Sequence, residues 1–320
     1  MDPTRQTIDQ TLLLAGLSAY VVGALALFGY FLLRSAPLRR IGMPLAAIGC
    51  AAQLAELGTR WWMTGVWPLT NLYGSLSLFS AVGVLIFLLF AYRYDLAFAG
   101  GFVMTFAAIA LTYGMTWNEG YMPAVPALQS YWIKIHVPIV VSAYAAFMVS
   151  FCVSLIYLVK AAAESRYRRR TALVASGATP RAMAMDAFAI GELRNDTPGI
   201  TAAAATGDAS AIWLAGLPSL AKLDAMQYRI IAVGLPLLSL GIITGAMWAK
   251  EAWGAYWQWD PKETAALTSW IVYAIYMHLH TRPEWRGART AWISVIGFAS
   301  IVFCYLGVNI WISGLHSYKV

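Results

Sequence analysis

Long uncharged apolar stretches alternate with short polar or basic segments along the chain. Six stretches are long enough to cross a hydrocarbon core of about 30 Å as helices of roughly 20 residues. They are residues 12–33, 72–92, 96–115, 137–159, 230–249 and 291–312. Two weaker stretches are residues 41–57, which contain a glutamine and a glutamate, and residues 264–279, which contain His278. The pattern predicts an all-α fold: a polytopic membrane helical bundle of about eight transmembrane helices, with residues 1–320 as a single integral membrane domain.

Composition supports this class and adds an orientation. Hydrophobic residues make up 60% of the chain and charged residues 12%, whereas roughly half of a soluble domain is apolar. Cytoplasmic loops retain Lys and Arg. If both termini lie on the outer side, 16 of the 22 basic residues fall on the inner side, so we predict this topology. The net charge of +7 follows from it, and no soluble basic face is left to bind nucleic acid.

One long segment, residues 160–222, separates the fifth span from the sixth. It opens with Arg166-Tyr-Arg-Arg-Arg and continues through Ala-, Thr- and Gly-rich sequence, which predicts a largely flexible cytoplasmic loop. Its end, residues 217–229, has apolar residues at near-helical spacing and fits a helix along the membrane surface before the sixth span.

The cysteines indicate neither redox nor zinc chemistry. Cys50, Cys152 and Cys304 fall within predicted spans and form no CxxC pair. The chain also lacks the CxxCH motif that would attach haem covalently to it. We interpret the three cysteines as packing residues.

The densest chemical signal is an outer segment, residues 248–264, between the sixth and seventh spans. It contains Trp248, Trp253, Trp257 and Trp259. Tryptophan favours the headgroup region, so an aromatic belt explains one or two of these rings. Interleaved with Gly254 and Ala255, the rings can instead form a flat platform on which a planar aromatic ligand stacks. Both interpretations stay open on the residues alone.

Asp260 follows the tryptophans and precedes Pro-Lys-Glu. This order is typical of a helix start, with an N-cap residue, a proline at the first position and a glutamate at the third. It favours a capping role for Asp260 over a direct ligand or acid-base role, which the sequence leaves open.

Two of the four histidines share the outer face with the tryptophans. His136 begins the fifth span and His316 follows the eighth. A lone histidine in a membrane is often a buried hydrogen-bonding residue, but two beside an aromatic platform can supply both axial nitrogens of a haem iron. Lys134, Lys250 and Lys262 can pair with haem propionates, although solvated anchoring at a helix end is the favoured role for any one of them.

The other two histidines lie toward the inner side. His278 is about twelve residues, or ~18 Å, along the seventh span from its outer start, too far to join the outer site. An ionisable residue within a span is a functional candidate by default, here as a second ligand point nearer the cytoplasm. We expect the neighbouring His280 to belong to the basic inner turn.

Several segments resemble one known family over most of the chain. The segment Gly241-Ile-Ile-Thr-Gly-Ala-Met-Trp-Ala-Lys-Glu-Ala-Trp-Gly-Ala-Tyr-Trp-Gln-Trp-Asp-Pro-Lys-Glu-Thr264 resembles the tryptophan-rich (WWD) haem-handling signature of the CcsA-type, or ResC-type, cytochrome c synthesis proteins of system II. Further similar segments are Trp132-Ile-Lys-Ile-His136, Leu223-Asp-Ala-Met-Gln-Tyr-Arg229, Ala274-Ile-Tyr-Met-His278 and Gly307-Val-Asn-Ile-Trp-Ile-Ser-Gly-Leu-His316-Ser-Tyr.

The resemblance implies roles for particular residues. His136 and His316 would be outer axial ligands, and His278 would mark a haem site within the membrane. The porphyrin would be held by Trp253, Gly254, Trp257, Trp259 and Asp260. Haem b would be the bound cargo, joined outside to CxxCH cysteines of apocytochrome c. A ResB-type membrane partner would complete a holocytochrome c synthase in a bacterial cell membrane or a plastid thylakoid membrane, with no catalytic nucleophile or base from this chain.

Three positions depart from the family pattern. Val66 replaces a histidine, Gly74 a glutamate and Ala265 a tryptophan. Two other functions fit the same residues. One is a haem exporter that passes haem to a separate chaperone, and the other is a haem-free membrane scaffold whose tryptophans form a belt.

Overall fold

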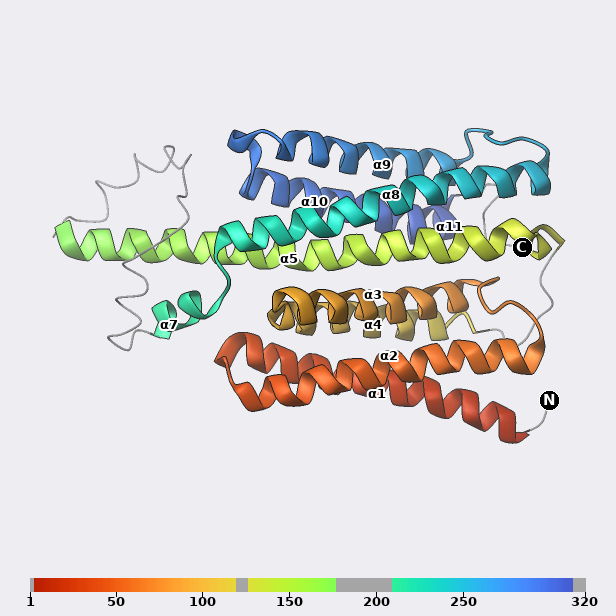
Figure 1. Cartoon of the computed structure of the whole chain (residues 1–320), viewed down its shortest axis with the longest axis horizontal. Coiled ribbons are helices and arrows are strands. Elements are labelled where there is room, and N and C mark those ends of the chain that lie inside the picture. Colours follow the sequence, from red (N-terminus) through yellow and green to blue (C-terminus); the bar gives the residue numbers. More distant parts are fainter. Residues whose placement is uncertain (1–2, 119–125, 177–208, 313–320) are drawn as a thin grey trace.

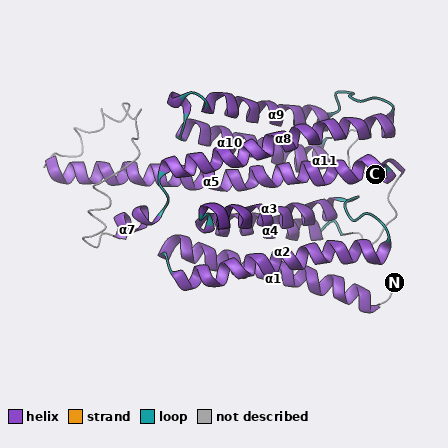
Figure 2. Ribbon diagram, in the orientation of Figure 1, coloured by secondary structure: helices purple, strands orange, loops and turns teal. Residues whose placement is uncertain are grey.

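The computed structural model describes residues 3–118, 126–176 and 209–312. They form long helices lying roughly along one axis, with no strand among them (Figure 1; Figure 2). The helices are α1 (Pro3–Leu33), α2 (Ala36–Thr64), α3 (Leu72–Tyr94), η1 (Ala97–Ala99), α4 (Gly100–Met115), η2 (Pro126–Gln129), α5 (Tyr131–Ser176), α7 (Ala209–Gly216), α8 (Leu220–Trp253), α9 (Pro261–His280), η4 (Pro283–Trp285), α10 (Ala288–Val302), the π-helical η5 (Phe303–Gly307) and α11 (Val308–Trp311).

The predicted spans are confirmed as helices. Within the described residues, seven helical segments are long and apolar enough to cross a membrane. The predicted seventh span, residues 264–279, forms α9, which packs against α8 and α10 but does not reach the same apolarity. Its buried residues all carry a hydroxyl or an imidazole group and are Ser269, Tyr273, Tyr276 and His280.

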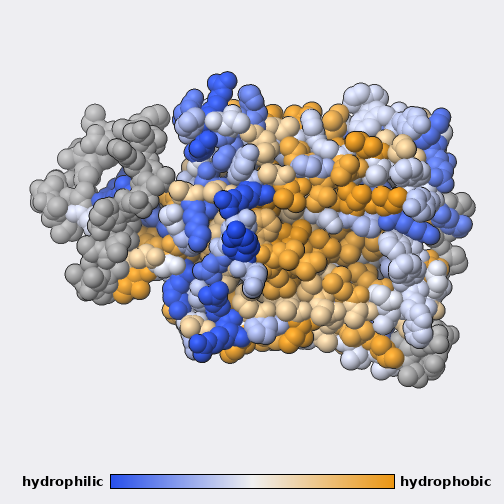
Figure 3. Space-filling view, in the orientation of Figure 1, coloured by the Kyte–Doolittle hydropathy of each residue, from blue (hydrophilic) through white to orange (hydrophobic). Residues whose placement is uncertain are grey.

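The surface has the distribution expected of a membrane bundle. Apolar side chains cover the middle of the face seen in Figure 3, and hydrophilic side chains gather toward both ends. α1 begins and α11 ends at the same end of the bundle, as the predicted topology requires (Figure 1). Helices satisfy most of their backbone hydrogen bonds internally, which is what a hydrocarbon environment demands. The chain is an integral, multi-pass membrane protein.

The boundaries of the inner loop were wrong. α5 continues to Ser176, well past residue 160, and the expected surface helix is instead the first part of α8. The segment just before α8 is held against α5 by Lys160. The Lys160 ammonium donates to the carbonyl oxygens of Leu217 and Pro218 at 3.2 and 2.6 Å. Ser219 then caps α8 at once. Residues 177–208 lie outside the described part of the chain.

α5 is the central helix and packs against α3, α8 and α10. Glycines on α8 bring it close to α5: a Cβ on Gly234 would lie 2.9 Å from the Phe147 ring, and one on Gly241 3.1 Å from Val140. Small residues permit this approach between membrane helices. The close packing places the start of α5 beside the end of α8.

Candidate functional site

The start of α5 is tied to the last turn of α8 by one serine. Ser130 accepts the backbone N–H of Trp132 at 3.1 Å and donates to the Glu251 carboxylate at 2.8 Å. No local pattern predicts this pair, because its members are 121 residues apart in the chain. The hydrogen bond holds the two segments that carry the candidate ligands in one arrangement.

His136 lies in the second turn of α5 and faces α8. Its Nδ1 is 2.9 Å from the carbonyl oxygen of Gly241. A carbonyl oxygen only accepts, so Nδ1 carries the proton and Nε2 keeps its lone pair. The described residues offer Nε2 no hydrogen-bond partner. Metal-binding histidines commonly donate their other ring N–H in this way, so the geometry of His136 fits an iron ligand.

Gly245 and Trp248 of α8 lie beside the His136 ring. A Cβ on Gly245 would lie 2.8 Å from the ring carbon Cε1, so the close approach of the ring requires glycine. The Trp248 ring lies 12° from parallel to the imidazole, with centroids 6.3 Å apart. Trp248 is buried, and its ring centroid lies 4.6 Å from that of Trp253. These residues form one aromatic group around the candidate ligand.

The tryptophan-rich segment leaves α8 at Gly254. This residue has a φ of +84°, a left-handed conformation that favours glycine, and its N–H donates to the carbonyl oxygen of Lys250 at 3.0 Å. In the following loop, Trp257 and Trp259 meet edge to face with centroids 5.7 Å apart. The segment therefore carries a second aromatic pair beyond the end of the helix.

The two rings of this pair differ in exposure. Trp259 is 69% exposed and has a φ of +58°, which is unfavourable for a bulky side chain. The Nε1 of Trp257 is buried and has no hydrogen-bond partner among the described residues. Strained backbone conformations, and buried polar atoms without a hydrogen-bond partner, cluster at ligand sites.

Asp260 is confirmed as the N-cap of α9. Its Oδ2 accepts the N–H of Lys262 at 3.0 Å, and Glu263 bonds back to the N–H of Asp260 at 3.2 Å. The same Glu263 oxygen accepts the N–H of Gln258 at 2.8 Å. The reciprocal capping box fixes the loop that carries Trp257 and Trp259 onto the helix.

The structure separates the candidate histidines. His136 lies with Trp248 and Trp253 at the outer end, whereas His278 lies in the last turn of α9, roughly 26 Å along the helix from Pro261. The side chain of His278 is exposed on the bundle surface. His316 lies outside the described residues.

His280 stands where α9 meets the basic inner turn, and its carbonyl oxygen accepts from Arg286 Nε at 2.9 Å. The histidine ends α9, is buried, and forms a 2.9 Å hydrogen bond from Nε2 to the Asp224 carboxylate. Its ring stacks on Tyr228 and Tyr276. Asp224 also accepts the backbone N–H of Gly287 at 3.1 Å, so it joins α8 and α9 to the start of α10. Asp224 lies in a segment recognised from the sequence, but its partners are distant along the chain.

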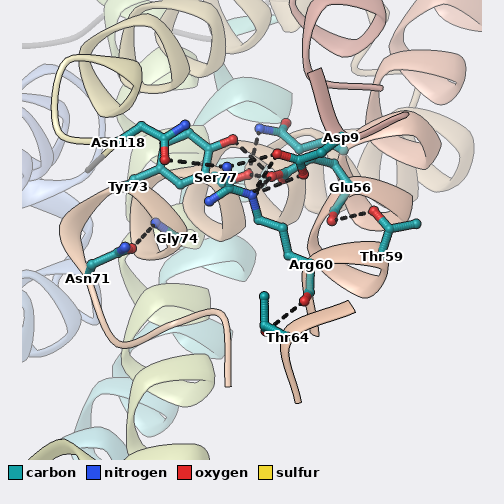
Figure 4. Close-up of polar contacts among 11 residues, drawn as sticks. Asp9, Glu56, Thr59, Arg60, Thr64, Asn71, Tyr73, Gly74, Ser77 and Asn118 are labelled. Carbon is teal, nitrogen blue, oxygen red and sulfur yellow. Dashed lines mark hydrogen bonds and ion pairs between the residues drawn. The ribbon is translucent and has the colours of Figure 1, made fainter. Parts of the chain in front are cut away.

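A charged network on α1, α2 and α3 was also missed (Figure 4). Arg60 donates from Nη2 to the Asp9 carboxylate at 2.9 Å, and its Nε lies 2.7 Å from Glu56. Glu56 accepts the hydroxyls of Tyr73 and Ser77 at 2.9 and 3.0 Å. The three charged side chains are buried. Because ions are costly within a membrane, such a set must be paired internally.

The departures from the family pattern have unequal consequences. A Cβ on Gly74 would lie 1.8 Å from the carbonyl oxygen of Pro68, so glutamate cannot replace Gly74 without movement of this turn. Asn71 caps α3 by accepting the N–H of Gly74 at 2.8 Å. Val66 is exposed and Ala265 half-buried, and neither needs its own residue type for the contacts described.

Comparison with known proteins agrees with this architecture. Residues 69–316 match the family described as Cytochrome C assembly protein. The cytochrome c biogenesis protein CcsA of Gloeothece citriformis is 36% identical over 292 residues, 88% of each chain. CcsA of Guillardia theta is 34% identical, covering 87% of this chain and 85% of that protein. CcsA of Microcystis aeruginosa is 37% identical, covering 87% of each.

A solved structure shares the fold. The chain named Cytochrome c Heme Lyase CcmF superposes with a TM-score of 0.60 at 15% sequence identity, over 94% of this chain. The present chain spans 46% of CcmF, so the likeness concerns the helical fold alone. The family match and the extent of the CcsA relatives lead to one conclusion: the chain belongs to the Cytochrome C assembly protein family, as a CcsA-type cytochrome c biogenesis protein.

Proposed function

We propose that this chain holds haem at the outer end of its bundle and presents it for covalent attachment to apocytochrome c. It would act as the haem-handling part of a cytochrome c synthase. The observation that carries this proposal is the hydrogen bond from His136 Nδ1 to Gly241, which leaves Nε2 available to iron. The aromatic rings at the same place suit a planar macrocycle.

His316 would supply the second axial nitrogen. It follows Trp311, the end of α11, by five residues, a length that reaches at most about 18 Å. The Lys262 ammonium bonds Asn309 of α11 at 2.7 Å, which ties α11 to the first turn of α9. The end of α11 is therefore held at the start of α9, the helix that follows the tryptophan-rich loop.

The chemical role proposed for this chain is to position the haem vinyl groups for reaction with the cysteine thiols. A cysteine S–H adds across each haem vinyl group: sulfur bonds the carbon next to the ring, and hydrogen goes to the terminal carbon. This addition needs no further oxidant or reductant for atoms and electrons to balance. Holding the vinyl groups and thiols in a fixed geometry lowers the entropic barrier. No nucleophile or general base from this chain is required.

His278 would mark a second haem-binding point, nearer the inner side. Its side chain is exposed on α9, whose described length carries no other histidine on that surface. A second ligand would then come from another chain, for which a ResB-type membrane partner is our proposal. An exposed ionisable residue on a membrane helix is suited to an interface rather than to lipid.

The visible spectrum of the purified protein tests the proposal. With haem supplied, the wild type should show a Soret band with low-spin features that weaken in His136→Gly and His316→Gly and return when imidazole is added. His280→Gln is the matched control, since His280 is bonded to Asp224 and should leave the spectrum unchanged. Loss of the Soret band only in His278→Ala would indicate that the haem binds within the membrane instead.

Two outcomes would favour the other functions. Absence of a Soret band in every preparation would support a haem-free scaffold. Co-expression with a ResB-type partner and an apocytochrome should yield haem that survives denaturing electrophoresis on the cytochrome. Haem found instead on a separate chaperone, without covalent attachment, would support an exporter.

A further inference from the structure

Two arginines from separate helices converge on one aromatic ring, at the end of the bundle opposite the start of α1. The guanidinium carbons of Arg93 and Arg229 lie over the Tyr94 ring, 5.1 and 4.9 Å from its centroid. Arg93 and Tyr94 end α3, whereas Arg229 lies in the third turn of α8, and Figure 1 shows both segments at the same end of the bundle. The predicted topology makes this end the inner one.

The two guanidinium groups bring positive charge together without a matching anion. Because both distances are measured to one centroid, the charges are at most about 10 Å apart, which is close enough for them to repel. The next carboxylate in the chain, Asp95, is already paired with Arg39 at 2.8 Å. Within the described ranges, neither guanidinium forms an ion pair or a hydrogen bond. Their N–H groups are therefore available to an anion from outside the chain.

Exposed apolar side chains lead up to both arginines. On α8, Val233 and Leu240 are 52% and 49% exposed and follow Arg229 at helical spacing, which places all three on one face of the helix. On α3, Leu89 is 61% exposed and lies one turn before Arg93. Both helices are long and apolar enough to cross a membrane, so these faces meet lipid acyl chains. The arginines lie where the acyl region ends and the headgroups begin.

A single arginine at this level needs no ligand. Long basic side chains reach toward the headgroups, and inner loops retain positive charge. Two arginines on one ring are different, because the shared ring holds them together against their repulsion. Stacking uses the face of a guanidinium and leaves its N–H edge free to bind a phosphate in a bidentate manner. Basic side chains at the inner membrane surface attract the headgroups of anionic lipids.

We propose that Arg93 and Arg229, held by Tyr94, bind the phosphate of an anionic phospholipid in the inner leaflet. The acyl chains of this lipid lie along the exposed faces of α3 and α8. The phosphate neutralises the two charges and links the end of α3 to the beginning of α8, two helices that both pack on α5. The site needs no haem, so its success or failure is independent of the proposed function.

Native mass spectrometry of the full chain in detergent tests the inference. The probes are dioctanoyl phosphatidylglycerol, dioctanoyl phosphatidylcholine and inorganic phosphate. The wild type should bind phosphatidylglycerol more tightly than the other two. Arg93→Gln and Arg229→Gln should each weaken that binding about fivefold, the effect of one basic residue at an anionic lipid surface. Arg40→Gln is the matched control, since it removes the same charge from an exposed position at the same end of the bundle, and should leave binding unchanged.

A variant of the ring separates this site from general attraction between charges. Tyr94→Leu keeps both arginines but removes the ring that holds them, and should weaken phosphatidylglycerol binding about threefold. Equal binding of the two lipids by the wild type, or equal weakening by Arg40→Gln and the variants of Arg93 and Arg229, would overturn the inference. Inorganic phosphate bound as tightly as phosphatidylglycerol would also overturn it, because the site would then take free phosphate rather than lipid.

Discussion

Two polar regions at the outer end of the bundle have opposite characters. In the network of Asp9, Glu56 and Arg60, each charged side chain is bonded to another member of the set. Around His136, by contrast, one ring nitrogen is bonded to Gly241, and the described residues offer the other no partner. Buried polar groups that satisfy one another hold helices together, whereas groups with unused bonding capacity are suited to a ligand. The first region should govern stability and the second haem binding.

The largest effect should follow from Arg60→Met. It leaves the carboxylates of Asp9 and Glu56 buried without a cation, which costs about 3–5 kcal/mol. Thermal unfolding in detergent measures the change. The exposed Arg40→Met is the control and should stay within about 0.5 kcal/mol of wild type. Equal midpoints for the two variants would show that the network contributes nothing to stability.

Gly74→Ala should destabilise the protein by about 1–3 kcal/mol. The added Cβ would lie 1.8 Å from the Pro68 carbonyl oxygen, so the turn before α3 must move. Gly58→Ala is the matched control, because nothing lies within 4 Å of its Cβ position. The same unfolding assay applies. A Gly74 variant as stable as the Gly58 variant would contradict the packing described for this turn.

Gly245→Ala tests the second region of the comparison, the surroundings of His136. Its Cβ would lie 2.8 Å from His136 Cε1 and should displace the imidazole ring proposed as the iron ligand. We expect haem affinity to fall about tenfold, or about 1.4 kcal/mol, with a smaller change in unfolding than in Gly74→Ala. Soret titration measures it, again with Gly58→Ala as control. Unchanged affinity would argue against His136 as the ligand.

The smallest effect should come from Trp259→Gly. Glycine relieves the left-handed backbone and should raise the free energy of unfolding by up to about 1 kcal/mol. Loss of one stacking ring should weaken haem binding about threefold to tenfold. Opposite signs in the two assays would assign Trp259 to the ligand site. Haem binding equal to wild type would instead support the interpretation of Trp259 as part of an aromatic belt.

Local patterns were sufficient for the framework. Apolar stretches of the required length determined which segments span the membrane, and the Asp-Pro-Lys-Glu order determined where α9 begins. These features depend on neighbours a few residues away, which the sequence displays directly. The same reasoning misjudged the inner loop, because the helical continuation of α5 and the bonds from Lys160 to residues 217 and 218 are not visible as hydropathy.

The choice among similar residues needed the tertiary structure. His278 and His280 are two positions apart, which turns their side chains about 200° around the helix. Only the neighbours of α9 decide that His280 is buried against Asp224 and His278 exposed. Likewise, His136 was recognisable as a candidate, but its tautomer depends on Gly241, 105 residues away. The sequence by itself determined the helices and the residue types at each end, and the packing of distant segments decided which polar groups are bonded to one another and which are available to bind a ligand.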